Sequence, residues 1–241
     1  MKFRLILVLT LMFCVAQTHA QTKVYLLPTL HRMHATNIQY NYDTLQAIVA
    51  RINPDMVAVE LRPEDENADT AYLRQNYPYE MWMMRYWQPS ATIKGFDWLG
   101  KELEGKPISP RYWQEHSNIK ALQQLLAADT AFNKKMEACA LYNKQRMPVL
   151  QSGSINDIIR GNDALLVRAY YDCLTSRLRG TDYEALPLFY TERDRKLQQN
   201  VLQIINNNSG KTIVILTGVD HYAYTLEALK KATGVVLLQP L

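Results

Sequence analysis

Two short apolar runs, one near each end of the chain, are each followed at once by a histidine. Residues 24–30 lead into His31, and residues 213–219, with Asp220, lead into His221. Apolar runs of this length that are rich in β-branched residues predict buried strands. In open α/β sheets, ligands bind outside the carboxyl ends of the strands. We therefore expect the two imidazoles to lie at one site.

The pattern between these runs predicts a strand–helix–strand unit of the parallel type. Residues 42–52 have the spacing of an amphipathic helix, and the apolar run 56–61 predicts a second strand. Residues 71–87, rich in aromatic residues and methionine, predict helix broken at Pro78, and residues 92–97 predict a third, shorter strand.

The middle of the chain is predicted to be a long helical insertion. Residues 111–178 have a helical pattern with expected breaks at Pro148 and at 152–153. A further helix over 189–205 and two last strands follow, at 212–217 and 235–238. The whole pattern predicts one α/β domain over residues 21–241, with a mixed or mostly parallel central sheet flanked by helices. We expect the insertion to cover the carboxyl edge of that sheet.

The first twenty residues have the features of a secretory signal peptide. Lys2 and Arg4 precede the apolar stretch 5–16, and residues 18–20 fit a cleavage site after Ala20. This predicts a periplasmic or secreted protein with no stable membrane span after cleavage, because the later apolar stretches are interrupted by charges.

Composition narrows the expected partners. Removing Lys2 and Arg4 lowers the formal net charge from +4 to +2, and the charged residues are interspersed. Without a basic stripe we expect no nucleic-acid partner and instead a small-molecule or peptide substrate. Cys139 and Cys173 remain after processing, and they are expected either to form a disulfide between two helical segments or to be separate buried thiols.

Glu60 and Arg193 are the other candidate site residues. Glu60 ends the second predicted strand, so it is either a partnered carboxylate at the same edge or a solvated strand end. Arg193 lies on the apolar stripe of its helix and needs an anionic partner, unless it extends to solvent from the helix end. With Glu192 and Asp194 expected to face elsewhere, Glu60 is the predicted partner of Arg193.

His221 is expected in the first turn of a helix. Asp220 is predicted to be the N-cap of that helix. The positive end of the helix dipole disfavours an imidazolium, and a neutral His221 suits metal ligation or proton abstraction.

Four short motifs in this order resemble the TraB/GumN/TIKI family, which is related in fold to erythromycin esterases and ChaN-like haem-binding proteins. They are residues 28–31, residues 57–61, residues 192–195 and residues 218–221. The resemblance spans the mature chain and implies metal-dependent hydrolysis. Pro28 departs from the family pattern, which has glycine there; proline lacks a backbone N–H and cannot adopt positive φ.

These observations predict an exported, metal-dependent hydrolase, either peptidase-like or esterase-like. His31, Glu60 and His221 are expected to hold a divalent metal ion or, without one, to position a water as general base. Arg193 is expected to orient Glu60 or to stabilise an oxyanion. Two alternatives stay open: a non-catalytic protein that binds haem or another small ligand in the same cleft, and a degenerate scaffold, for which Pro28 is the main argument.

Overall fold

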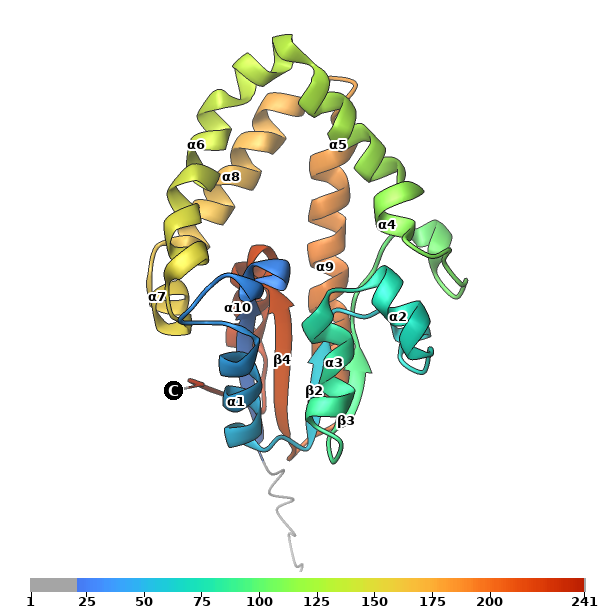
Figure 1. Ribbon diagram of the computed structural model, residues 1–241, viewed down its shortest axis with the longest axis vertical. Coiled ribbons are helices and arrows are strands. Elements are labelled where there is room, and N and C mark those ends of the chain that lie inside the picture. The colour runs from blue at the N-terminus through green and yellow to red at the C-terminus, as the bar shows by residue number, and fades with distance from the viewer. Residues whose placement is uncertain (1–20, 241) are drawn as a thin grey trace, which may run out of the picture.

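The structure, a computed structural model, describes residues 21–240 (Figure 1). The predicted signal peptide, residues 1–20, lies outside the described residues. Five strands form one sheet in the order β3-β2-β4-β1-β5, and every strand pair is parallel. The strands are β1 (Thr22–Thr29), β2 (Met56–Val59), β3 (Thr92–Gly95), β4 (Thr212–Gly218) and β5 (Val235–Leu238). The predicted α/β fold is thus confirmed, with a sheet that is parallel throughout.

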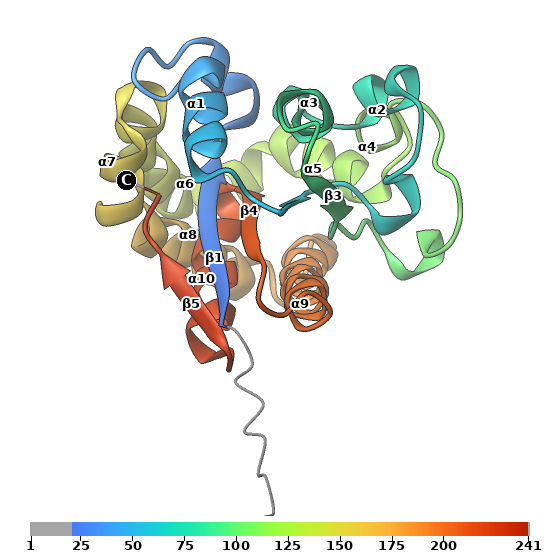
Figure 2. The same cartoon turned by 90° about the horizontal axis from the view of Figure 1, so that it is seen from below.

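Alternate side chains of the strands bury opposite faces of the sheet. In β2, Val57 and Val59 belong to one apolar cluster, whereas Met56 and Ala58 belong to another. The first face packs against α1 (Tyr42–Ile52), α3 (Tyr79–Trp87) and α7 (Ile155–Arg160). The second packs against α9 (Ala185–Asn206) and α10 (Val219–Lys231), on the other side of the sheet in Figure 2. Burial on both faces explains why the strands are continuous apolar runs instead of alternating ones.

The chain reverses its winding direction between β1 and β4. From β1 it passes through α1, on the first face, to β2 on the far side of β4. From β4 it passes through α10, on the second face, to β5 on the far side of β1. The carboxyl ends of β1 and β4 therefore form a topological switch point, the place where open α/β sheets bind their ligands.

A group of helices, here called the helical cover, arches over the carboxyl edge of the sheet (Figure 1). Its members are α4 (Tyr112–Glu115), α5 (Asn118–Ala128), α6 (Thr130–Ser152), α8 (Asp163–Leu178) and the first turns of α9. These helices pack around an apolar cluster of their own, which includes Met136, Leu178 and Leu186. Cys139 of α6 and Cys173 of α8 form a disulfide across this cluster, with 5.5 Å between their Cα atoms. The predicted covering insertion is confirmed.

The expected helix break at Pro148 is wrong. Helix α6 continues through Pro148 to Ser152. Pro148 removes one backbone hydrogen bond from this helix but does not end it. The helix ends instead at Gly153, where a Cβ atom would lie 2.6 Å from the Val149 carbonyl oxygen.

The remaining short elements are the helix α2 (Thr70–Asn76) and the 3-10 turns His31–Ala35, Pro63–Asp65 and Lys101–Leu103. The break at Pro78 between α2 and α3 is as predicted. Within residues 21–240, no helix is long and apolar enough to cross a membrane.

Candidate functional site

Glu60 lies directly after β2 and is held by hydrogen bonds from the end of β4. Its Oε1 atom accepts hydrogen bonds from Thr217 Oγ1 at 2.5 Å and from the Gly218 backbone N–H at 2.8 Å. The residue is only 4 % exposed, so it is not a solvated strand end. Burial by itself raises the pKa of the Glu60 carboxyl, but the charges of His221, His31 and Arg193 outweigh that effect and lower it.

Gly218 lets Glu60 and His31 approach each other. A Cβ atom at position 218 would lie 2.9 Å from His31 Nε2 and 3.3 Å from Glu60 Oε2. Both side chains therefore border the space that any larger residue would fill. This close approach requires glycine at the end of β4.

His31 is held in a left-handed turn at the end of β1. Its φ is 51°, a conformation that histidine adopts only when neighbours hold it there. The Leu30 N–H donates to His34 Nε2, and His34 Nδ1 donates to the Tyr40 carbonyl oxygen. Tyr42 donates its hydroxyl hydrogen to the His31 carbonyl oxygen. The buried His34 thus has a structural role, and burial lowers its pKa.

The imidazole of His31 pairs with Glu80, a residue that the sequence analysis missed. His31 Nδ1 lies 2.7 Å from Glu80 Oε1, and Glu80 is fully buried on α3. The His31 side chain itself stays 41 % exposed. Desolvation opposes the charged imidazole, but the hydrogen bond and charge of Glu80, with the charges of Glu60 and Asp220, raise the pKa of His31 to about 9.

His221 makes the matching contact on the other side of the site. Its Nδ1 lies 2.5 Å from Asp194 Oδ1, and both residues are buried. Desolvation again opposes the charge, but Asp194 more than offsets it and raises the pKa of His221. The helix dipole alone disfavours the imidazolium of His221, but the carboxylates of Asp194 and Glu60 act in the opposite direction. The expectation that Asp194 faces elsewhere is wrong, because Asp194 shares the buried stripe of α9 with Leu197 and Val201.

Asp220 is not the N-cap of α10, contrary to the sequence prediction. Helix α10 starts directly at the end of β4, with no side-chain cap, and Asp220 lies in its first turn. The Asp220 Oδ1 atom accepts a hydrogen bond of 2.6 Å from Arg146 Nη2 of α6. Arg146 also binds Asp163 of α8, with 2.8 Å between Nε and Oδ1. This buried cluster connects the helical cover to the sheet edge.

Arg193 pairs with Asp97 and not with Glu60, so that part of the prediction is wrong. Two parallel hydrogen bonds of 2.9 and 3.0 Å join the guanidinium to Asp97, which follows β3. Arg193 acts on Glu60 through its charge, which lowers the pKa of the Glu60 carboxyl. Burial raises the pKa of the Asp97 carboxyl, and Arg193 counteracts this shift. Asp97 ends the third predicted strand, 92–97, so it could have been found by the same reasoning that selected Glu60.

Pro28 costs the sheet no hydrogen bond. The Lys23 N–H donates to Lys211 on the β4 side, so the odd-numbered residues of β1 direct their N–H groups toward β4. Position 28 therefore faces the β5 side, where pairing ends at Tyr25. Its carbonyl oxygen accepts a hydrogen bond of 2.7 Å from the Tyr40 hydroxyl. The missing N–H thus leaves the pairing of β1 intact.

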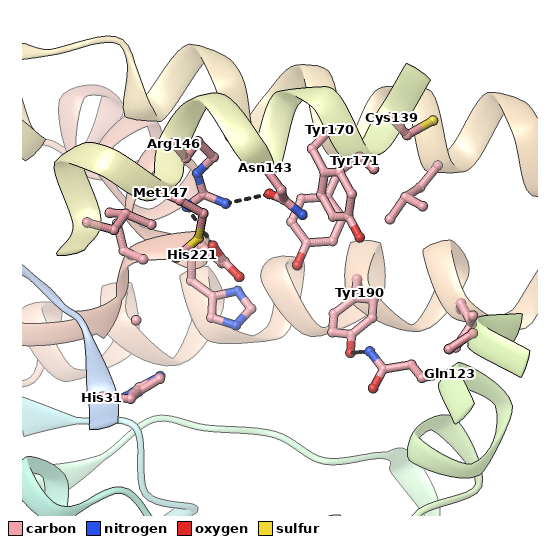
Figure 3. Close-up of a pocket in the computed structure, with 18 of the residues that line it drawn as sticks. His31, Gln123, Cys139, Asn143, Arg146, Met147, Tyr170, Tyr171, Tyr190 and His221 are labelled. Carbon is pink, nitrogen blue, oxygen red and sulfur yellow. Dashed lines mark hydrogen bonds and ion pairs between the residues drawn. The ribbon is translucent and has the colours of Figure 1, made fainter. Parts of the chain in front are cut away.

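A cavity of about 720 Å³ lies between this edge and the helical cover. His31, Arg193 and His221 line it, whereas Glu60 is buried against Gly218. Figure 3 shows His31 and His221 toward one end of the cavity, with Gln123 and Cys139 toward the other. Its volume is typical of small-molecule sites.

The donor set fits a divalent metal ion in its chemistry. His31 and His221 each have a carboxylate at Nδ1, which leaves Nε2 available, and histidine ligands of metals have such partners as a rule. Over residues 21–240, however, no three His, Cys, Asp or Glu side chains are already arranged around one point as metal ligands.

Comparisons with protein-family models, curated proteins and solved structures find no significant match to this chain.

Proposed function

We propose that this chain is an exported hydrolase of the TraB/GumN type, with His31, Glu60, Arg193 and His221 as its reaction centre. The observation that carries the proposal is the pair of histidine–carboxylate contacts, His31–Glu80 and His221–Asp194, at one edge of one cavity. A carboxylate that orients an imidazole and stabilises its charged form is the arrangement that acid–base catalysis needs.

The charge balance of the site supports a role for bound cations. The carboxyl groups of the site outnumber its two guanidinium groups, which belong to Arg146 and Arg193. The carboxyl groups are those of Glu60, Glu80, Asp97, Asp163, Asp194 and Asp220. This excess of negative charge favours the protonated imidazoles, so it raises the pKa values of His31 and His221. A divalent ion held by His31, His221 and Glu60 would also compensate this excess. Such an ion would lower the pKa of a bound water and polarise a carbonyl group.

In the metal-free form of this proposal, the residues of the chain have separable roles. His221 accepts a proton at Nε2 from the attacking water, and Asp194 stabilises the imidazolium that forms. His31, with its pKa of about 9, is protonated at neutral pH and donates a proton to the leaving group. Arg193, fixed by Asp97, places positive charge at the cavity wall, where an oxyanion develops.

The test measures hydrolysis of chromogenic esters and fluorogenic peptides, together with metal content, in the purified protein. His31→Ala and His221→Ala should each lower kcat/KM by about 100-fold or more, the usual contribution of a general acid or base. The exposed His116 is the matched control, and His116→Ala should leave the rate unchanged. Full activity in both site variants would overturn the proposal. Metal bound by the wild type and lost in both site variants would support the metal-dependent form.

A binding function without turnover is the second candidate. Methionine and tyrosine side chains line the cavity, including Met136, Met147, Tyr170 and Tyr171, and such residues suit an apolar ligand or haem. A visible absorption band in the purified protein, with no hydrolysis of any substrate, would favour this candidate.

A further inference from the structure

The cavity changes character from one end to the other. At the sheet edge it is lined by charged groups, among them His31, Arg193 and His221. At the helical end its wall is apolar and formed by Leu126, Met136, Leu174, Leu178 and Leu186. A ligand that fills the whole cavity must therefore be polar at one end and apolar at the other.

Three amide side chains of the helical wall, Gln123, Asn133 and Asn143, already have partners. Gln123 Nε2 donates to the Tyr190 hydroxyl at 2.5 Å, and Asn133 Nδ2 donates to the Ala127 carbonyl oxygen at 2.8 Å. Asn143 Oδ1 accepts a hydrogen bond of 3.2 Å from Arg146. A peptide backbone in this part of the cavity would compete with these contacts for its own N–H and C=O groups. An alkyl or aryl chain needs no such partners, so the wall favours it over a peptide.

Helix α6 indicates how far the cavity extends. Arg146 and Met136 both line it, ten residues apart on this helix. At 1.5 Å per residue the two positions are about 15 Å apart along the axis. The helical end therefore has room for an extended chain and not only for an acetyl or methyl group.

We propose that the helical end of the cavity is a subsite for the apolar acyl chain of an ester substrate, with the ester carbonyl at His31 and His221. This inference rests on the proposed hydrolase function and names its substrate class. In the reaction, the water oxygen bonds to the acyl carbon while the bond to the alcohol oxygen breaks. The proton from water passes to His221, and the alcohol receives its proton from His31.

The experiment compares chain lengths in two ways. The first compares kcat/KM for p-nitrophenyl acetate, butanoate, octanoate and decanoate in the wild type. Each buried methylene contributes about fourfold to binding, so decanoate should exceed acetate by at least tenfold even with partial burial. The second is calorimetric binding of decanoate and acetate to His221→Ala, which separates binding from turnover.

Substitutions on α6 locate the effect. Ala140 lines the cavity, and the nearby exposed Ala138 does not. Ala140→Trp should abolish the preference for long chains, whereas Ala138→Trp should retain it. Ala127→Trp on α5 repeats the test from another wall, in case the first variant does not fold.

The outcomes separate the two proposals. Hydrolysis with no chain-length preference, or with a preference for peptides, would overturn the subsite and leave the hydrolase. Binding of decanoate that Ala140→Trp weakens at least tenfold, with no hydrolysis by the wild type, would support the subsite and count against the hydrolase.

Discussion

At the sheet edge, charged side chains are fixed by directional contacts, whereas the helical cover is held by an apolar cluster and a disulfide. His31, His221 and Arg193 each have one carboxylate at a defined atom. The cover packs through residues such as Leu178 and Leu186 that tolerate volume-conserving exchanges. Because of this difference, we expect substitutions at the sheet edge to alter the reaction and substitutions in the helical cover to alter which ligand fits.

The largest expected effect comes from breaking the connection between the two regions. Arg146→Met leaves the buried Asp163 without its ion-pair partner, which should lower the free energy of unfolding by about 3–5 kcal/mol. Urea denaturation measures this change. Arg195→Met is the control, because Arg195 and Glu192 form an exposed pair within α9, and such pairs contribute little to stability.

A second variant tests the cause of that loss. Adding Asp163→Leu to Arg146→Met should recover most of the stability, because an apolar pair replaces the uncompensated charge. An Arg146→Met variant as stable as Arg195→Met would show that the cluster does not connect cover and edge.

An intermediate effect is expected from the cover alone. Replacing Cys139 and Cys173 together by alanine opens a loop with a sequence separation of 34 and should lower the free energy of unfolding by about 2–4 kcal/mol. Hydrogen exchange should accelerate in α6 and α8 while the sheet stays protected. Reduction of the disulfide should lower the free energy of unfolding of the wild type to that of the double alanine variant. Equal loss of protection in the sheet would show that the disulfide does not act on the helical cover alone.

The smallest effect is a pH dependence at the edge, measured in chelator-treated protein. Because folding raises the pKa of His31 from 6.5 to about 9, its stabilising contribution is complete below pH 6.5 and is lost as the pH rises through 9. Glu80→Gln should move the pKa of His31 back toward its ordinary value and remove this loss of stability. NMR titration of His31 and urea denaturation across that range measure both changes.

The exposed Glu115, far from the site in sequence and outside the cavity lining, supplies the control. Glu115→Gln should leave the titration of His31 unchanged. An unshifted pKa of His31 in Glu80→Gln would mean that the contact with Glu80 does not set its charge.

The sheet and the location of the candidate site could be predicted because they depend on short-range patterns. Apolar runs predicted the strands, and the carboxyl-edge rule then placed His31, Glu60 and His221 together. The helical insertion was predictable as a cover because only its length and periodicity were needed.

The partners of the site residues could not be predicted equally well, because they depend on the rotation of helices and on distant contacts. Arg193 and Asp194 are neighbours on α9, about 100° apart around its axis, and the rotation of the helix decides which one faces His221. Glu80 contacts His31 although the two residues are far apart in sequence, so no local pattern indicates the pair. Asp220 is not the cap because α10 begins at Val219, directly after β4, and the Asp220 carboxylate instead pairs with the distant Arg146.

The position of β4 has a consequence for how the molecule folds. This strand lies between β1 and β2, and its register pairs Thr212 with Lys23. The centre of the sheet can therefore form only when two parts of the chain that are distant in sequence come into contact. Contacts of such high sequence separation slow folding, because loop closure must occur before any pairing stabilises it. We expect β1 and β2 to lack their shared neighbour until β4 inserts between them, and Glu60 and His31 to come together only in that late step.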